Sequence, residues 1–148
     1  MNLIATNIAK VKHRIQQAAE QSGRAMTEVT LLAVSKKHPA QCIAEAYSQT
    51  NQQHFGENYA QELAQKHQFL SLTQQLPLVW HFIGPIQSNK CTIISQCSDW
   101  VHSVDRQKVA HKLSEARAQL MANNPTLAPL NICLQINIDD EASKSGIA

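Results

Sequence analysis

The chain has 148 residues, the size of one ordinary domain, and its 43% hydrophobic and 16% charged residues indicate a folded globular protein rather than a disordered one. A formal net charge of +2 is too small for an electrostatic nucleic-acid binder. No run of about 20 apolar residues could cross a membrane, so neither nucleic acid nor a membrane is expected as a partner.

The cysteines and histidines show no metal-site spacing. The four cysteines include no Cys-x-x-Cys pair, and no two histidines have zinc-finger spacing, so we expect no structural metal. No glycine-rich dinucleotide motif and no P-loop are present. The first residues contain no apolar segment typical of a signal peptide. Free thiols in a reducing cytoplasm are the simplest expectation.

Taken in chain order, the hydrophobic pattern switches between helical and strand spacing. Apolar residues at helical intervals predict helices over 4–18, 40–47, 58–70, 89–97 and 106–121. Apolar runs rich in β-branched and aromatic residues predict strands over 28–35, 53–58, 78–84, 99–105 and 130–138. The first run is continuously apolar and is expected to form a buried strand. Asp105 is expected to cap the helix that follows it.

This alternation predicts an α/β fold, because strands separated by helices pair in parallel through right-handed crossovers. Five such units fit either an open doubly wound sheet or part of a (β/α)8 barrel, since a complete barrel needs about 250 residues. No linker, low-complexity tract or repeat divides the chain. We expect a single domain over residues 1–148.

The run Leu31–Lys37, "LLAVSKK", ends an apolar strand with two adjacent lysines. A solvated strand end, a phosphate clamp or an amine kept near neutrality would each explain the pair, because lysine is rarely buried without a partner. Only a neutral amine attacks a carbonyl, and both partial burial and the charge of Lys37 favour the neutral form of Lys36. Successive strand side chains point to opposite faces, so only one of the two lysines can face the interior.

Polar residues also follow the other predicted strands, at the carboxyl ends where ligands gather in parallel α/β folds. Together with Lys36, these positions are Glu57, Asn58, Gly84, Asp105 and Asn137. The alternative for most of them is that any strand end becomes polar as it enters a loop. Asn58 either offers a donor and an acceptor to a ring hydroxyl or an imine, or caps the next helix. His81, inside a predicted strand, is either a hydrogen-bonded core histidine or a ligand contact.

Five segments together resemble the pyridoxal phosphate homeostasis proteins, in order and spacing. They are "LLAVSK", "FGENYAQE", "WHFIGPIQSNK", "HSVD" and "LQINIDDEASKSGI", and the similarity extends from the first helix to the last residue. The resemblance implies a (β/α)8 barrel related to the N-terminal domain of alanine racemase, with pyridoxal 5′-phosphate (PLP) as its cofactor. It assigns Lys36 as the Schiff-base lysine and Asn58 to a place beside the cofactor. His81 and Asn137 are further candidates for cofactor contacts.

The resemblance implies a carrier and buffer for the vitamin B6 cofactor and for amino-acid balance, cytoplasmic, monomeric at full length, and without catalysis. Two alternatives remain open: a Schiff-base enzyme, such as a fold-type III racemase or a class I aldolase, and an inactive fragment. A racemase needs a second acid or base opposite the lysine, and the sequence shows no tyrosine placed for that role.

This sequence also departs from the family pattern. The family continues through three more barrel strands, which carry a serine-containing segment and a Gly-Thr turn that bind the cofactor phosphate. Neither is present in these 148 residues. We therefore expect an incomplete barrel of about five β/α units, with weak cofactor affinity. Such a chain is expected to be unstable, to self-associate, or to pair with the missing C-terminal part.

Overall fold

The computed structural model describes residues 3–138 and 145–147 of the chain. Its helices are α1 (Leu3–Gln21), α2 (Ala40–Thr50), α3 (Ala60–Lys66), α4 (Cys91–Cys97) and α5 (Gln107–Asn123). Its strands are β1 (Ala33–Val34), β2 (His54–Glu57), β3 (Val79–Phe82), β4 (Trp100–Val104) and β5 (Asn131–Leu134). Short 3-10 turns span Met26–Glu28 and Ser88–Lys90, and a π-helical turn, His67–Thr73, extends α3.

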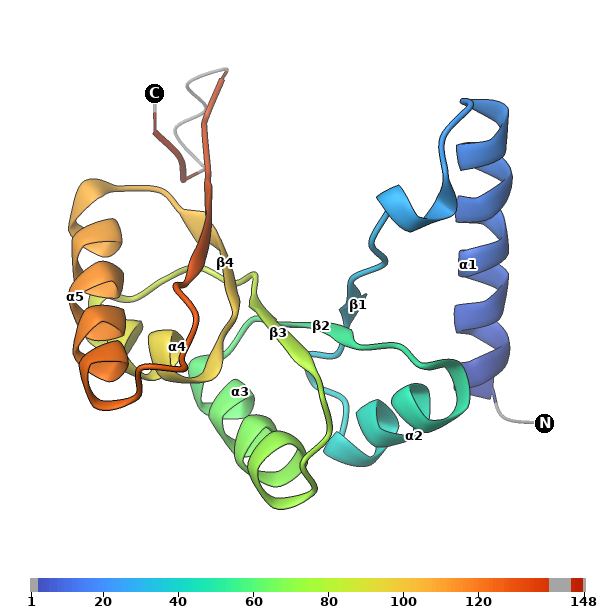
Figure 1. The fold of residues 1–148 in the computed structure, drawn as a ribbon. Helices are drawn as coiled ribbons and strands as arrows, with labels where there is room; N and C mark the ends of the chain where they lie inside the picture. Colours follow the sequence, from blue (N-terminus) through green and yellow to red (C-terminus); the bar gives the residue numbers. More distant parts are fainter. Residues whose placement is uncertain (1–2, 139–144, 148) are drawn as a thin grey trace.

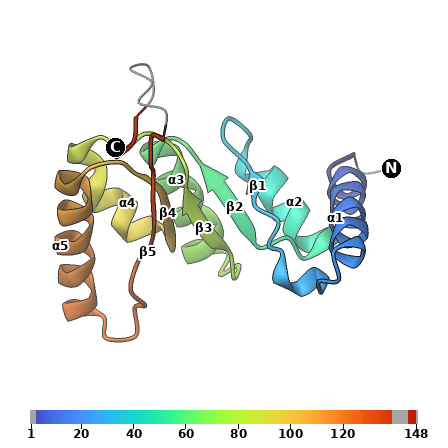
Figure 2. The same cartoon turned by 90° about the horizontal axis from the view of Figure 1, so that it is seen from above.

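The five strands form one parallel sheet in the order β1-β2-β3-β4-β5, and the helices lie on its outer side (Figures 1 and 2). A doubly wound sheet reverses its strand order at a switch point and carries helices on both faces. Sequential order with helices on one side is instead the arrangement of part of a β/α barrel. The prediction of an α/β fold with parallel strands is therefore confirmed, and of the two sheet types the barrel-like one is present.

The alternation of side chains along the strands builds the core. Phe55, Trp80, Phe82 and Val101 are at most 2% exposed and face the helices. The helices contribute the fully buried Ile43, Leu63, Leu70, Ile94, Val109 and Leu113 to the same cluster. The opposite, concave face of the sheet carries the alternate residues, among them three histidines. Neighbouring residues of one strand thus serve the core and the concave face in turn.

The two outer strands are shorter than predicted. The first strand covers only Ala33–Val34 rather than 28–35, and Val34 is 50% exposed, so the prediction of a buried strand there is wrong. The fifth covers Asn131–Leu134 rather than 130–138. Among the described residues, each outer strand pairs with a single neighbour in the sheet, so its other backbone edge has no strand partner there.

Two predicted helix starts also differ. Arg106, not Asp105, occupies the N-cap position of α5, and no side chain caps this helix. Asp105 pairs instead with the guanidinium of Arg106 at 2.6 Å. Tyr59 is the N-cap residue of α3, so neither Glu57 nor Asn58 caps that helix. Within the described ranges, no helix is long and apolar enough to cross a membrane.

Candidate functional site

Lys36 and Asn58 lie just beyond the ends of two neighbouring strands. Val34 pairs with Gly56 in the register of β1 and β2, and each of the two polar residues follows its strand residue by two positions. The ladder continues one step past β1, because the amide of Ser35 donates to the carbonyl of Gly56 at 2.9 Å. The sheet therefore brings these two predicted site residues to one edge.

Lys36 begins a tight turn. The amide of His38 donates to the carbonyl of Ser35 at 3.1 Å, and Lys37 has a left-handed backbone with φ of 62°. The Lys36 side chain is exposed, so the partial burial expected for it is not present in this structure. Its amine is accessible to a ligand at the strand ends.

Asn58 has a buried oxygen with no partner. Among the described residues, none donates a hydrogen bond to its Oδ1 atom. Its backbone packs against Gly84, where even a Cβ atom would collide with the carbonyl oxygen of Asn58. A buried acceptor left unpaired is unfavourable, so the geometry suits a ligand that donates a hydrogen bond there.

Behind the turn lies a buried ionic cluster. Glu57 is fully buried, and its Oε1 atom accepts hydrogen bonds from Ser35 Oγ at 2.6 Å and from Lys66 Nζ at 2.7 Å. Burial raises the pKa of the Glu57 carboxyl, and the hydrogen bonds from Lys66 and Ser35 oppose this effect. The cluster ties the end of β1 to β2 and α3.

His81 lies in the centre of a chain of three histidines on the concave face. Its Nε2 atom is 2.9 Å from His54 Nδ1, and its Nδ1 atom is 2.9 Å from His102 Nε2. The ring also stacks on Trp100, with centroids 5.8 Å apart. Burial, followed by repulsion from His102 and His54, lowers the pKa of His81 to about 4. Both ring nitrogens already have protein partners, and a contact of His81 with a cofactor stays a prediction.

Asn137 lies beyond β5, at the opposite edge of the sheet from β1. Its amide donates to the carbonyl of Ile147 at 2.9 Å. Three strands separate it from β1 in the sheet order, so the pairing does not place it beside Lys36. Its role as a cofactor contact likewise stays a prediction.

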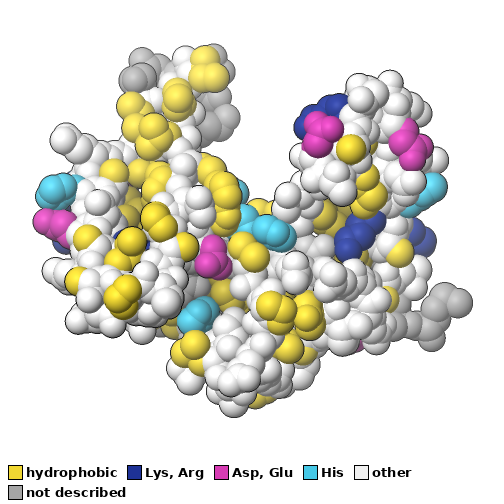
Figure 3. Space-filling model, in the orientation of Figure 1, with side chains coloured by type: hydrophobic (Ala, Val, Ile, Leu, Met, Phe, Trp, Pro, Cys, Tyr) yellow, Lys and Arg dark blue, Asp and Glu magenta, His cyan; other side chains and the backbone are white. Residues whose placement is uncertain are grey.

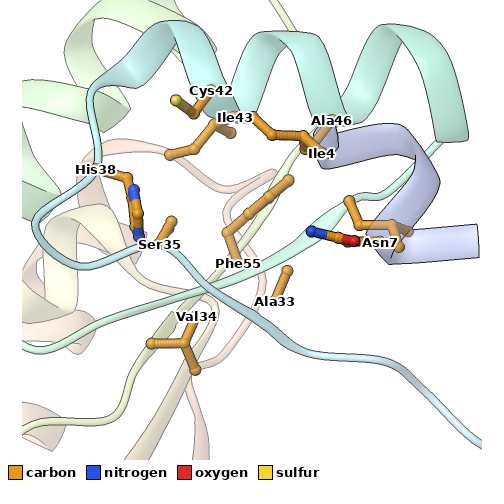
Figure 4. Close-up of a pocket in the computed structure, with 11 residues that line it drawn as sticks. Ile4, Asn7, Ala33, Val34, Ser35, His38, Cys42, Ile43, Ala46 and Phe55 are labelled. Atoms are coloured by element: carbon orange, nitrogen blue, oxygen red, sulfur yellow. The ribbon is translucent and has the colours of Figure 1, made fainter. Parts of the chain in front are cut away.

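A separate apolar cavity of about 340 Å³ lies between α1, β1 and α2 (Figure 4). Ile4, Ala33, Ile43 and Phe55 are among its lining residues, and the close-up shows them together with Val34 and Ser35 of the β1 end. Neither Lys36 nor Asn58 is among the described residues that line it. This cavity lies on the helix side of the sheet and is distinct from the strand-end site.

Comparison with curated proteins places the chain among known relatives. It is 52% identical over 148 residues to the pyridoxal phosphate homeostasis protein of Pseudomonas aeruginosa, and 47% identical over 147 residues to that of Escherichia coli. This chain is similar to the pyridoxal phosphate homeostasis proteins. The matches cover 100% and 99% of this chain but only 60% of each relative. No model of a protein family matches it.

Solved structures also resemble this chain, and they too match it over only part of their own length. PipY of Synechococcus elongatus, in a structure with PLP bound, is 34% identical with a TM-score of 0.71, over 90% of this chain and 57% of PipY. A protein from Bifidobacterium adolescentis is 29% identical with a TM-score of 0.82, over 98% of this chain and 59% of its own. These two proteins are therefore similar to this chain both in sequence and in the arrangement of their strands and helices.

The sequence pattern did not predict several residues of this chain that the fold brings together. His54 and His102 are not among the predicted site residues, although each lies in a predicted strand that neighbours the strand of His81 in the sheet. Lys66 was missed as well, since a lysine in a predicted helix is usually solvated. A register prediction for the parallel strands could have found the histidines. Nothing in the sequence pattern marks Lys66 as buried.

Proposed function

We propose that this chain binds pyridoxal 5′-phosphate at the ends of β1 and β2, with Lys36 as the covalent attachment point. The observation that carries the proposal is the neighbouring placement of the accessible Lys36 amine and the unpaired, buried Oδ1 atom of Asn58. The PLP-bound structure of PipY, a relative of similar fold, supports it. Similarity to the homeostasis proteins supports a role in carrying and buffering the cofactor.

The residues present fit the aldehyde end of this cofactor. PLP supplies an aldehyde carbon that condenses with a primary amine, with loss of one water. The Lys36 amine must first release a proton, and its exposure lets solvent accept it. Asn58 Oδ1 can accept a hydrogen bond from a ring hydroxyl, which would satisfy that buried oxygen. His81 and Asn137 are proposed as secondary contacts.

The residues described so far do not account for the phosphate end of the cofactor. The resemblance assigns it to a serine-containing segment and a Gly-Thr turn, which this sequence does not contain. In this proposal, residues 1–148 form one incomplete domain of a (β/α)8 barrel related to the N-terminal domain of alanine racemase. The cytoplasmic location stays a prediction.

The residues near the strand ends support a carrier of the cofactor better than they support a racemase. A racemase uses a second acid or base opposite the lysine. His81 has a pKa lowered to about 4 and is therefore neutral near pH 7, with both ring nitrogens already 2.9 Å from other histidines. Such a ring is a poor proton donor. This favours a carrier without turnover over the enzyme alternative.

Titration with PLP tests the binding proposal. We expect a saturable absorbance band from the lysine-linked cofactor, and borohydride reduction followed by peptide mass spectrometry should place the label on Lys36. Lys36→Ala should remove both signals, while Lys108→Ala, a matched change of an exposed lysine on α5, should keep them. A band that survives in Lys36→Ala would sink the proposal, as would labelling spread evenly over the lysines.

The enzyme alternative has its own assay. The protein is incubated with PLP and L-alanine, and D-alanine is measured against a reaction containing Lys36→Ala. The carrier proposal expects the two reactions to be equal. Production of D-alanine that depends on Lys36 would instead establish a racemase.

A further inference from the structure

One helix holds the backbone on both sides of Lys36. Nζ of Lys66 donates to the carbonyl oxygen of Ser35 at 2.8 Å, and the amide of Lys37 donates to Oε1 of Glu62 at 2.7 Å. Both charged residues belong to α3. The carbonyl of Ser35 and the amide of Lys37 belong to the two peptide planes that flank the Cα atom of Lys36.

Holding these two planes sets the direction of the Lys36 side chain. A peptide unit is rigid, so the backbone at Lys36 has only its two dihedral angles free. When both flanking planes are hydrogen-bonded to α3, these two angles are fixed. The Cα–Cβ bond of Lys36 then leaves the chain in one direction. The Lys36 side chain is exposed, so the backbone, rather than packing around the side chain, sets the direction of its Cα–Cβ bond.

The holding groups are themselves firmly placed. The three N–H groups of Lys66 have three acceptors, namely the carbonyl of Ser35, Oε1 of Glu57 and Oε1 of Glu62. Lys66 is only 5% exposed. A buried ammonium group whose three N–H donors are all satisfied is held in place, since losing any one acceptor would leave a buried N–H group without a hydrogen bond.

The turn needs such support. Lys37 has φ of 62°, in the left-handed region that a side chain with a Cβ atom disfavours. The hydrogen bond from its amide to Glu62 opposes that local cost. Without it, the turn can relax toward other conformations, and the peptide plane between Lys36 and Lys37 rotates with it.

We propose that Glu62 and Lys66 are positioning residues that aim the Lys36 amine toward the strand-end site. This proposal rests on the proposed function, since it assigns a role in the reaction of Lys36 with an aldehyde. Neither residue supplies a group to the ligand. Both act through the backbone on either side of the lysine.

Glu62 gives the sharper test because it is partly exposed, with 24% of its side chain accessible, so its loss should leave the protein folded. Glu62→Ala removes the acceptor for the Lys37 amide, and Glu62→Gln keeps an oxygen at the same place. Glu115→Ala is the matched control, because Glu115 forms an exposed i,i+4 pair with His111 on α5. Circular dichroism and thermal melts establish that each variant folds.

Two readouts are combined. Each variant is treated with PLP and borohydride, and the label on Lys36 is quantified by peptide mass spectrometry. Amide hydrogen exchange at Lys37, followed by NMR without cofactor, reports the hydrogen bond itself. In Glu62→Ala we expect labelling of Lys36 to fall about tenfold, the size expected for one charge-assisted hydrogen bond, and exchange at Lys37 to accelerate. Glu62→Gln should restore most of both signals, and Glu115→Ala should match the unmodified protein.

The remaining outcomes separate the two proposals. Unchanged labelling of Lys36 in Glu62→Ala would overturn the positioning role, as would a Lys37 amide that exchanges rapidly in the unmodified protein. Equal losses in Glu62→Gln and Glu62→Ala would point to the charge of Glu62 and would also overturn it. If the unmodified protein forms no adduct at Lys36 while its Lys37 amide is protected, the proposed function fails, and the contacts from α3 are then purely structural.

Discussion

The ammonium group of Lys66 lies 2.7 Å from Oε1 of Glu57, and neither side chain is more than 6% exposed. The pair joins the end of α3 to the end of β2, directly behind the turn that carries Lys36. A buried pair of this kind is costly to form but far more costly to break on one side, because the remaining charge stays buried alone.

Lys66→Met should therefore destabilise the protein by about 3 kcal/mol, since it leaves the Glu57 carboxylate without its cation. Methionine has a similar length, so the loss reflects charge and hydrogen bonding rather than volume. Urea unfolding followed by circular dichroism measures the change in unfolding free energy. Lys108→Met, at an exposed position on α5, is the control and should change little. Adding Glu57→Gln to Lys66→Met should recover part of the loss; no recovery would contradict this account.

The histidine chain predicts a loss of stability in acid. The pKa of His81 is lowered to about 4 by burial and by its histidine neighbours, against an ordinary value of 6.5 in the unfolded chain. Because the pKa is lowered in the folded protein, the unfolded chain binds a proton at a higher pH than the folded protein does. The contribution of neutral His81 to the unfolding free energy is therefore complete above pH 6.5 and is lost as the pH falls toward 4. Linkage gives a loss of up to about 3 kcal/mol over that range.

Unfolding free energies measured from pH 7.5 to 4 in the unmodified protein and in His81→Gln test this. The variant cannot gain a proton there, so its stability should fall less steeply with pH. His111→Gln, an exposed histidine on α5, should leave the slope unchanged. Parallel curves for the unmodified protein and His81→Gln would refute the assignment.

Gly84 is predicted to tolerate no side chain. A Cβ atom there would collide with the backbone of Asn58, which cannot rotate away as a flexible side chain would. Gly84→Ala should cost about 2 kcal/mol in unfolding free energy and displace Asn58, which would weaken any binding of PLP. Gly56→Ala is the matched control, because the three nearest atoms to its Cβ all belong to the side chain of Ile83, with the terminal Cδ1 atom nearest at 3.0 Å. If both variants were equally stable, the close approach of Gly84 to Asn58 would have no energetic weight.

The outer strand predicts self-association. Every second residue from β5 onward is apolar and exposed: Ile132 at 41%, Leu134 at 61%, Ile136 at 63% and Ile138 at 89%. Hydrophobic side chains gather on the projecting end of the chain in Figure 3. A row of exposed apolar side chains along the outer strand of a sheet favours contact with another chain.

Size-exclusion chromatography over a range of concentrations checks this. We expect larger species that grow with concentration, and the double variant Leu134→Lys and Ile136→Lys should shift the protein toward monomer. A concentration-independent monomer with a sharp, high melting transition would contradict the expectation of an unstable or self-associating chain.

The local pattern determined much of the fold. Apolar spacing located the five helices and five strands, and their alternation required parallel pairing. The motif around Lys36 and Asn58 was also visible, because a lysine and an asparagine at consecutive strand ends are local features. The lengths of β1 and β5 were not, because strand extent depends on whether a neighbour satisfies the backbone on each side.

Only the tertiary structure decided how side chains far apart in sequence meet. Register places His54, His81 and His102 in one hydrogen-bonded chain, although 27 and 21 residues separate the partners. The packing of α3 against the sheet buries Lys66, a residue whose type and helical position favour solvent. Sequence named Lys36 as the reactive lysine, since that depends on its motif. The groups that hold the backbone on both sides of it come from α3, because their hydrogen bonds of 2.7 and 2.8 Å exist only once that helix is docked.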